Sequence, residues 1–201
     1  MALALVCGFP MPASAQDFAT GVAAYQRGDY GLAFANFRTL AETGHVGARF
    51  NLGVMYSRGL GVSEDQVEAA RWYRLAADQG QMQARTNLGI MLEEGRGIAA
   101  DMEAAAGLYR LAAAQGDKLA MTRLGKMLVE GRGVARDPVE AVGLLSTAAA
   151  QGEADAQYAL AVLLFRGVGV APDRAEAERL LNLAAAQGHE EAREAVELLQ
   201  P

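Results

Sequence analysis

Residues 48–83 read ARFNLGVMYSRGLGVSEDQVEAARWYRLAADQGQMQ, and the same pattern continues to residue 191 in three further copies without an insertion. Alanine, glycine and aspartate each return with a period of 36 residues (84 − 48). A fixed period of this size indicates stacked supersecondary units rather than one globular core. The repeating positions are Ala48, Ala84, Ala120, Ala156 and Ala192; Gly44, Gly80, Gly116, Gly152 and Gly188; and Asp65, Asp101, Asp137 and Asp173.

Each copy predicts two helices. In the first copy Ala48, Leu52 and Tyr56 fall on one helical face, and residues 69–77 repeat the same spacing of three to four. Gly59, Gly61 and Gly80 predict the two helix exits, because glycine readily adopts the positive φ of a helix end. Neither helix buries its apolar stripe alone, so the units are expected to stack.

An aspartate is expected to start each second helix. Asp65 is followed three residues later by Glu68, which is typical of a capping box. The pattern returns at Asp137/Glu140 and Asp173/Glu176, whereas after Asp101 the glutamate is one position early, at Glu103.

These motifs resemble the Sel1-like repeat, a branch of the tetratricopeptide superfamily. Leucine replaces an aromatic residue of the motif in the later copies, which keeps its apolar bulk. The resemblance implies an all-α, right-handed α-solenoid of stacked antiparallel helix pairs with about eleven helices. The matching residues are Ala48, Leu52, Gly53, Tyr56, Gly59, Gly61, Val62, Asp65, Ala69, Trp72, Tyr73, Ala76, Ala77 and Gly80, and the replacements include Leu92, Leu108, Leu128, Leu144, Leu145, Leu164, Leu180 and Leu181.

The repeats divide the chain into a signal segment, 1–15, and a single repeat solenoid, 16–201. Within the solenoid, 17–47 is a variant first repeat with a shorter loop, and 48–83, 84–119, 120–155 and 156–191 are full repeats. Residues 192–201 are expected to form a capping helix, because Glu197 replaces the small residue at the helix-packing position of Gly53, Gly89, Gly125 and Ala161.

The N-terminal residues MALALVCGFPMPASA predict a secretory signal peptide cleaved after Ala15, although they lack a positive n-region. The expected location is the periplasm or the extracellular space, and the alternative is a cytosolic scaffold. The only cysteine, Cys7, falls inside this segment, which suits an oxidising compartment. No later segment approaches the length of a membrane span, so the mature chain is expected to have none.

Composition argues against nucleic acid as a partner. The chain carries 24 acidic and 18 basic residues, a net charge of −6, without the basic cluster that phosphates require. No enzyme, cofactor or metal site is predicted. The two histidines, His45 and His189, are interpreted as solvated turn residues four repeats apart, and the G-x-G runs at 95–97 and 131–133 as helix exits.

In the superfamily the first helix of each repeat lines a concave groove, so the resemblance implies the contact positions. Unlike the framework positions, these differ from repeat to repeat, as expected of a surface that selects a protein or peptide. Phe50, Tyr158 and Phe165 are favoured because aromatic side chains are enriched in binding hot spots. The candidate partner-binding residues are Phe50, Val54, Arg58, Thr86, Ile90, Glu94, Lys126, Glu130, Tyr158, Val162, Phe165 and Arg166.

The leading hypothesis is a non-catalytic adaptor that binds a protein or peptide, in an unknown oligomeric state. The resemblance extends to regulators of envelope signalling and to assembly factors. The rival hypothesis is an enzyme acting on cell-wall or β-lactam substrates, as associated with cysteine-rich members of the family. Their cysteines pair within repeats, and residues 8–201 contain none.

Overall fold

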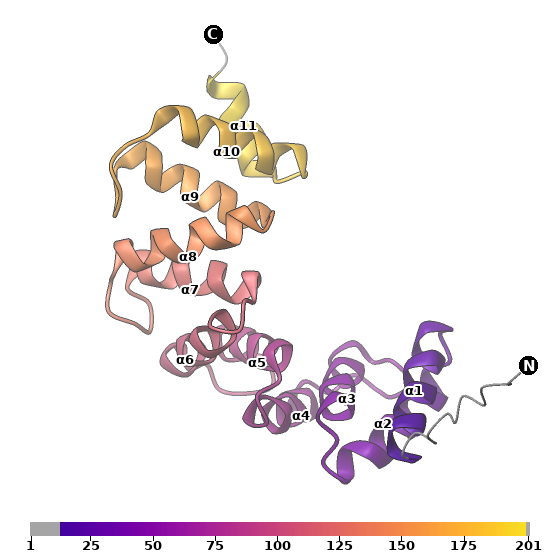
Figure 1. The fold of residues 1–201 in the computed structure, drawn as a ribbon. Coiled ribbons are helices and arrows are strands. Elements are labelled where there is room, and N and C mark those ends of the chain that lie inside the picture. Colours follow the sequence, from indigo (N-terminus) through magenta and orange to yellow (C-terminus); the bar gives the residue numbers. More distant parts are fainter. Residues whose placement is uncertain (1–12, 200–201) are drawn as a thin grey trace, which may run out of the picture. The chain divides into compact units, whose positions relative to one another are not determined.

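The computed structural model describes residues 13–199, with side chains from residue 17 onward, and this range consists of helices joined by turns and loops (Figure 1). It contains eleven helices, which confirms the all-α prediction. They are α1 Ala13–Gln26, α2 Tyr30–Glu42, α3 Val46–Arg58, α4 Gln66–Asp78, α5 Met82–Glu94, α6 Met102–Ala113, α7 Lys118–Glu130, α8 Pro138–Ala150, α9 Ala154–Arg166, α10 Arg174–Ala186 and α11 Glu190–Leu199.

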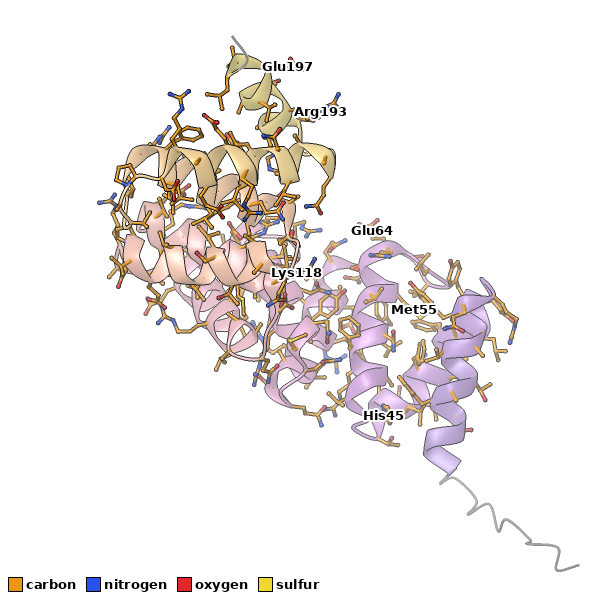
Figure 2. All side chains as sticks on the ribbon, turned by 45° about the horizontal axis from the view of Figure 1, so that its top comes forward. His45, Met55, Glu64, Lys118, Arg193 and Glu197 are labelled. Carbon is orange, nitrogen blue, oxygen red and sulfur yellow. The ribbon has the colours of Figure 1, made fainter. Side chains whose placement is uncertain are left out.

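The chain forms two compact units, one ending at Gln79 and the other beginning at Gly80. In the first unit α1 packs on α2, α2 on α3, and α3 on α4. Its core combines alanine with larger apolar side chains: Phe37, Leu52 and Met55 are fully buried, and Figure 2 labels Met55 on α3.

In the second unit each helix from α5 to α10 packs on the one that follows it. The helix pairs approach closely through a glycine: a Cβ on Gly89 would lie 2.7 Å from the ring of Tyr109, and one on Gly125 would lie 2.8 Å from Leu145. Ala161, fully buried, holds the equivalent position in the next repeat. The predicted role of these small residues is confirmed.

The loop between paired helices is held by a glycine contact. Gly131 ends α7 with φ of 75°, and Gly133, with φ of 65°, lies so close to the Met102 carbonyl that a Cβ there would collide with it. The G-x-G run is therefore a helix exit, as predicted, and its second glycine also packs against the preceding repeat.

The aspartate caps form as predicted, but the reciprocal half of the capping box does not. The Asp137 carboxylate accepts bonds from Val139 N and Glu140 N. The backbone N–H of Asp137 donates instead to the carbonyl of Leu128 on the paired helix α7, at 3.0 Å. Because that donor is occupied, the glutamate has nothing to cap; the same backbone bond recurs at Asp65, Asp101 and Asp173.

At its two ends the structure bears on the predictions differently. The expected signal peptide, 1–15, lies outside the described residues except for 13–15, which belong to α1. The predicted capping helix is α11, which buries Ala192 against its neighbours and leaves Glu197 exposed (Figure 2). Between residues 13 and 199, no helix is long and apolar enough to cross a bilayer.

Candidate binding cleft

Three successive first helices of the second unit, α7, α9 and α11, border a cleft of about 760 Å³, called here the C-terminal cleft. On α7 the buried residues Leu124, Met127 and Leu128 are three to four positions apart and face the core. The side chains between them therefore face outward and can line a cleft. The charged and aromatic lining residues are Lys126 and Glu130 of α7; Asp155, Tyr158 and Arg166 of α9; and His189, Glu190 and Glu191 at the start of α11.

The floor of the C-terminal cleft is apolar. It is formed by Val129, Leu145, Ala159, Val162 and Leu163. Leu145 is fully buried and Leu163 nearly so, whereas the two valines are half-buried. Such a surface favours an apolar side chain from a ligand over water.

Five of the twelve predicted contact residues meet in this cleft: Lys126, Glu130, Tyr158, Val162 and Arg166. Phe165 is half-buried and lies outside the cleft lining. The sequence pattern thus indicated outward-facing residues on α7 and α9 that line one cleft, but it could not distinguish neighbouring faces at the end of α9.

Three predicted residues belong to α5. Ile90 is half-buried, and Glu94 is exposed and pairs with Arg96 at 2.6 Å. Thr86 is only 2 % exposed, and its hydroxyl donates to Asp117 Oδ2 at 2.8 Å. Thr86 is therefore part of the packing between repeats rather than an accessible contact residue.

In the first unit the predicted residues lie on α3. Phe50 is half-buried with its ring centroid 5.9 Å from that of Tyr73, Val54 is half-buried, and Arg58 is exposed. Phe50 is thus covered by a neighbouring helix on one side, which accounts for part of its apolar surface.

The interpretation of the histidines as solvated turn residues is wrong. His189 Nδ1 accepts a bond from Ala192 N at 3.3 Å and so caps α11, and its side chain is only 10 % exposed. Its ring stacks on Tyr158 with centroids 4.6 Å apart. His45 caps α3 in the same way and stacks on Phe18 at 4.5 Å. The missed signal is an aromatic residue on the preceding first helix, 31 residues before His189 (189 − 158) and 27 before His45 (45 − 18).

Several charges of the C-terminal cleft are already paired. Lys126 Nζ lies 3.1 Å from Asp155 Oδ2, and Glu130 lies 2.5 Å from Arg132 Nε. His189 Nε2 is 3.6 Å from Asp155 Oδ1, a distance longer than a hydrogen bond. The cleft therefore offers a fixed apolar and aromatic surface with charges at its rim.

A second group of charges, centred on Glu93, is internal. Tyr109, fully buried, donates its hydroxyl to Glu93 Oε2 at 2.8 Å, and Arg123 and Arg132 lie within 3.5 Å of the same carboxylate. Burial, and then the bond to Glu93, raises the pKa of Tyr109 well above 10.0. This network joins α5, α6 and α7 and leaves Glu93 largely covered.

Over residues 13–199 no group of three or more histidine, cysteine, aspartate or glutamate side chains is arranged to hold a metal ion. Both imidazoles act as helix caps, and the cleft carboxylates face cations or solvent.

Sequential helix pairs, glycine-mediated packing and aspartate caps define a helical repeat protein of the tetratricopeptide-like solenoid class. The chain belongs to the Sel1 repeat family: the Sel1 repeat matches residues 46–81, 83–117, 118–153 and 154–189. These boundaries begin about two residues before those expected from the alanine register.

Solved structures of similar proteins agree with the fold. A Sel1 repeat protein from Oxalobacter formigenes is 31 % identical, with a TM-score of 0.83 over 92 % of this chain and 75 % of that one. The c5321 protective antigen of uropathogenic Escherichia coli, which displays an SLR fold, is 29 % identical with a TM-score of 0.68 over 91 % of this chain and 48 % of that one.

The immunity protein Pa5087 from Pseudomonas aeruginosa is 23 % identical, with a TM-score of 0.55 over 92 % of this chain and 70 % of that one. At that identity the likeness concerns the fold alone. No curated protein matches this chain significantly.

Proposed function

We propose that this protein is a non-catalytic adaptor that binds a segment of another protein in the C-terminal cleft. The observation that carries the proposal is the cleft itself, because it joins an apolar floor to rim charges on three successive first helices. Repeat scaffolds stack such helices into extended binding surfaces. Tyr158 adds a rigid aromatic contact of the kind enriched in binding hot spots.

A non-catalytic role fits the state of the candidate acid–base groups. In each histidine the ring nitrogen Nδ1 accepts a backbone N–H from the helix that it caps, at 3.2 Å for His45 and 3.3 Å for His189. A general base must be free to take a proton from a substrate. Turnover of cell-wall or β-lactam substrates by the purified protein would support the rival enzyme hypothesis.

The test of the adaptor proposal is capture of partners by two matched variants. Val162→Glu places a carboxylate on the cleft floor, and Val139→Glu makes the same change at a position on α8 that is 69 % exposed and outside the cleft. Partners recovered with the wild type should be lost with Val162→Glu and kept with Val139→Glu. Equal recovery by all three proteins, with matching circular dichroism spectra, would rule out the cleft.

The proposed site of action is the periplasm or the extracellular space, after cleavage behind Ala15. The support is the small residues Ala13 and Ala15 after an apolar stretch. N-terminal sequencing of the protein from its native host should begin at Gln16. A chain that retains Met1 would favour a cytosolic scaffold instead.

A further inference from the structure

The charges of the C-terminal cleft are not balanced once its internal pairs are removed. Lys126 is neutralised by Asp155, and Glu130 by Arg132. Three charged lining residues remain: Arg166 on α9, and Glu190 and Glu191 at the start of α11. Over the described residues, neither Arg166 nor Glu190 has an ion-pair partner.

Glu191 is also available to a ligand. Its Oε2 lies 3.3 Å from His189 Nδ1. That nitrogen accepts the backbone N–H of Ala192, so a neutral imidazole has no proton there to donate to Glu191. Two carboxylates therefore stand together without a cation at one end of the cleft.

The two kinds of charge lie at opposite ends of the apolar floor. Glu190 follows His189, whose ring lies against Tyr158 near the start of α9. Arg166 is eight residues further along α9, and Val162 lies halfway between. A rise of 1.5 Å per residue separates Tyr158 from Arg166 by roughly 12 Å along the helix, which is about four residues of an extended chain.

We propose that the C-terminal cleft receives an extended segment of a partner protein with a lysine or arginine at one end, an apolar side chain in the middle and an acidic side chain about four residues away. The basic residue meets Glu190 and Glu191, the apolar side chain lies on Val162, and the acidic residue meets Arg166. The net excess of carboxylates makes the basic residue the stronger requirement. This inference rests on the proposed adaptor function and gives the chemistry of its ligand.

A random 12-residue peptide display library, selected on the full chain, tests the inference. Enriched peptides should share a basic residue and an apolar residue in close sequence, and their affinity should fall as salt concentration rises. A synthetic copy of an enriched peptide with its basic and acidic residues exchanged should bind at least tenfold more weakly. Enrichment of acidic or purely apolar peptides would overturn the inference.

Paired variants of α11 locate the binding. Glu190→Lys/Glu191→Lys should weaken binding at least tenfold, whereas Glu194→Lys/Glu197→Lys, the same change at exposed positions of the same helix outside the cleft, should change it less than twofold. Glu190→Gln/Glu191→Gln removes the charge with less strain on the helix start and should still weaken binding severalfold.

The outcomes separate this inference from the adaptor function. Enriched peptides whose binding ignores both α11 variants but is lost in Val162→Glu would leave the adaptor function standing and contradict the basic-segment inference. If no peptide is enriched and no partner is captured by the wild-type protein, both proposals fail.

Discussion

Two glycines of the same repeat stand in opposite environments, and they predict opposite effects of one substitution. A Cβ on Gly89 would lie 2.7 Å from the Tyr109 ring, whereas one on Gly107, in the middle of α6, meets nothing within 4 Å. Gly89→Ala should lower the free energy of unfolding by about 1–3 kcal/mol through overpacking. Gly107→Ala should raise it by about 0.5–1 kcal/mol, because alanine favours the helix.

Urea unfolding followed by circular dichroism measures both changes. A loss of stability in Gly107→Ala, or none in Gly89→Ala, would show that the close approach of α5 and α6 does not depend on the missing Cβ.

Tyr109 makes stability depend on alkaline pH. The folded protein keeps the phenol proton above pH 10, because the pKa of Tyr109 is raised, while the unfolded chain releases it near 10.0. Unfolding is therefore favoured as pH rises above 10. Tyr109→Phe lacks the hydroxyl that bonds to Glu93, so at pH 7 it should be about 1 kcal/mol less stable than the wild type.

Between pH 10 and 11 this deficit should shrink and reverse, since one ionisation corresponds to about 1.4 kcal/mol for each pH unit. Urea titrations of both proteins from pH 7 to 11 give the comparison. A deficit that stays constant across this range would mean that the Tyr109 pKa is not raised.

Single residues of one first helix contact the residue that caps the next first helix. Thr86 bonds to Asp117, and Tyr158 stacks on His189, each pair 31 residues apart. The first residue lies on a first helix, and the second caps the start of the next repeat's first helix. Equivalent positions of the repeats are 36 residues apart, so the 36-residue register does not pair these partners, and it predicts neither the stacked histidines nor the buried Thr86.

At the scale of elements, the aspartate caps that start the helices could be predicted from sequence, whereas the absence of the reciprocal capping bond could not. Aspartate at the position before a helix is a strong local signal, and it caps α4, α6, α8 and α10 as expected. The reciprocal half of the capping box is absent because Asp137 N instead donates to Leu128 O, across the loop between α7 and α8. Tertiary contacts of this kind have no signature in the nearby residues.

This difference predicts unequal costs at one helix start. Asp137→Ala should destabilise the protein by about 1 kcal/mol, because Val139 N and Glu140 N lose their acceptor. Glu140→Ala should cost less than half as much, since the Glu140 carboxylate caps nothing and only pairs with Arg110 at 3.2 Å. Thermal unfolding curves of the two variants measure the ratio; equal losses would indicate that the reciprocal cap forms in solution.

At the scale of the molecule, the 36-residue register anticipated the order of helices and the first-helix faces on which the cleft forms. It could not show that Lys126, Tyr158 and Arg166 share one cleft with Glu190 and Glu191, because that requires the depth of packing between α7, α9 and α11. From sequence alone, Glu190 and Glu191 are an ordinary acidic first turn of a helix. Their position at the rim of the cleft follows from the stacking of His189 on Tyr158.

The packing of α11 predicts how the second unit opens. Of its residues only Ala192 is buried, and α11 packs mainly on α10, whereas α7 and α8 are each covered on both sides by neighbouring helices. Because opening free energy follows buried contacts, α11 amides should exchange with deuterium fastest and those of α7 and α8 slowest within this unit.

A ligand in the C-terminal cleft contacts α11 and should therefore slow that exchange in particular. A ligand at a hundred times its dissociation constant stabilises the bound state by about 2.7 kcal/mol. Protection of the α11 amides against exchange should therefore rise by up to about a hundredfold. Hydrogen exchange mass spectrometry with and without an enriched peptide measures this. Protection elsewhere in the unit with unchanged exchange in α11 would place the ligand outside the C-terminal cleft and show that α11 does not contact it.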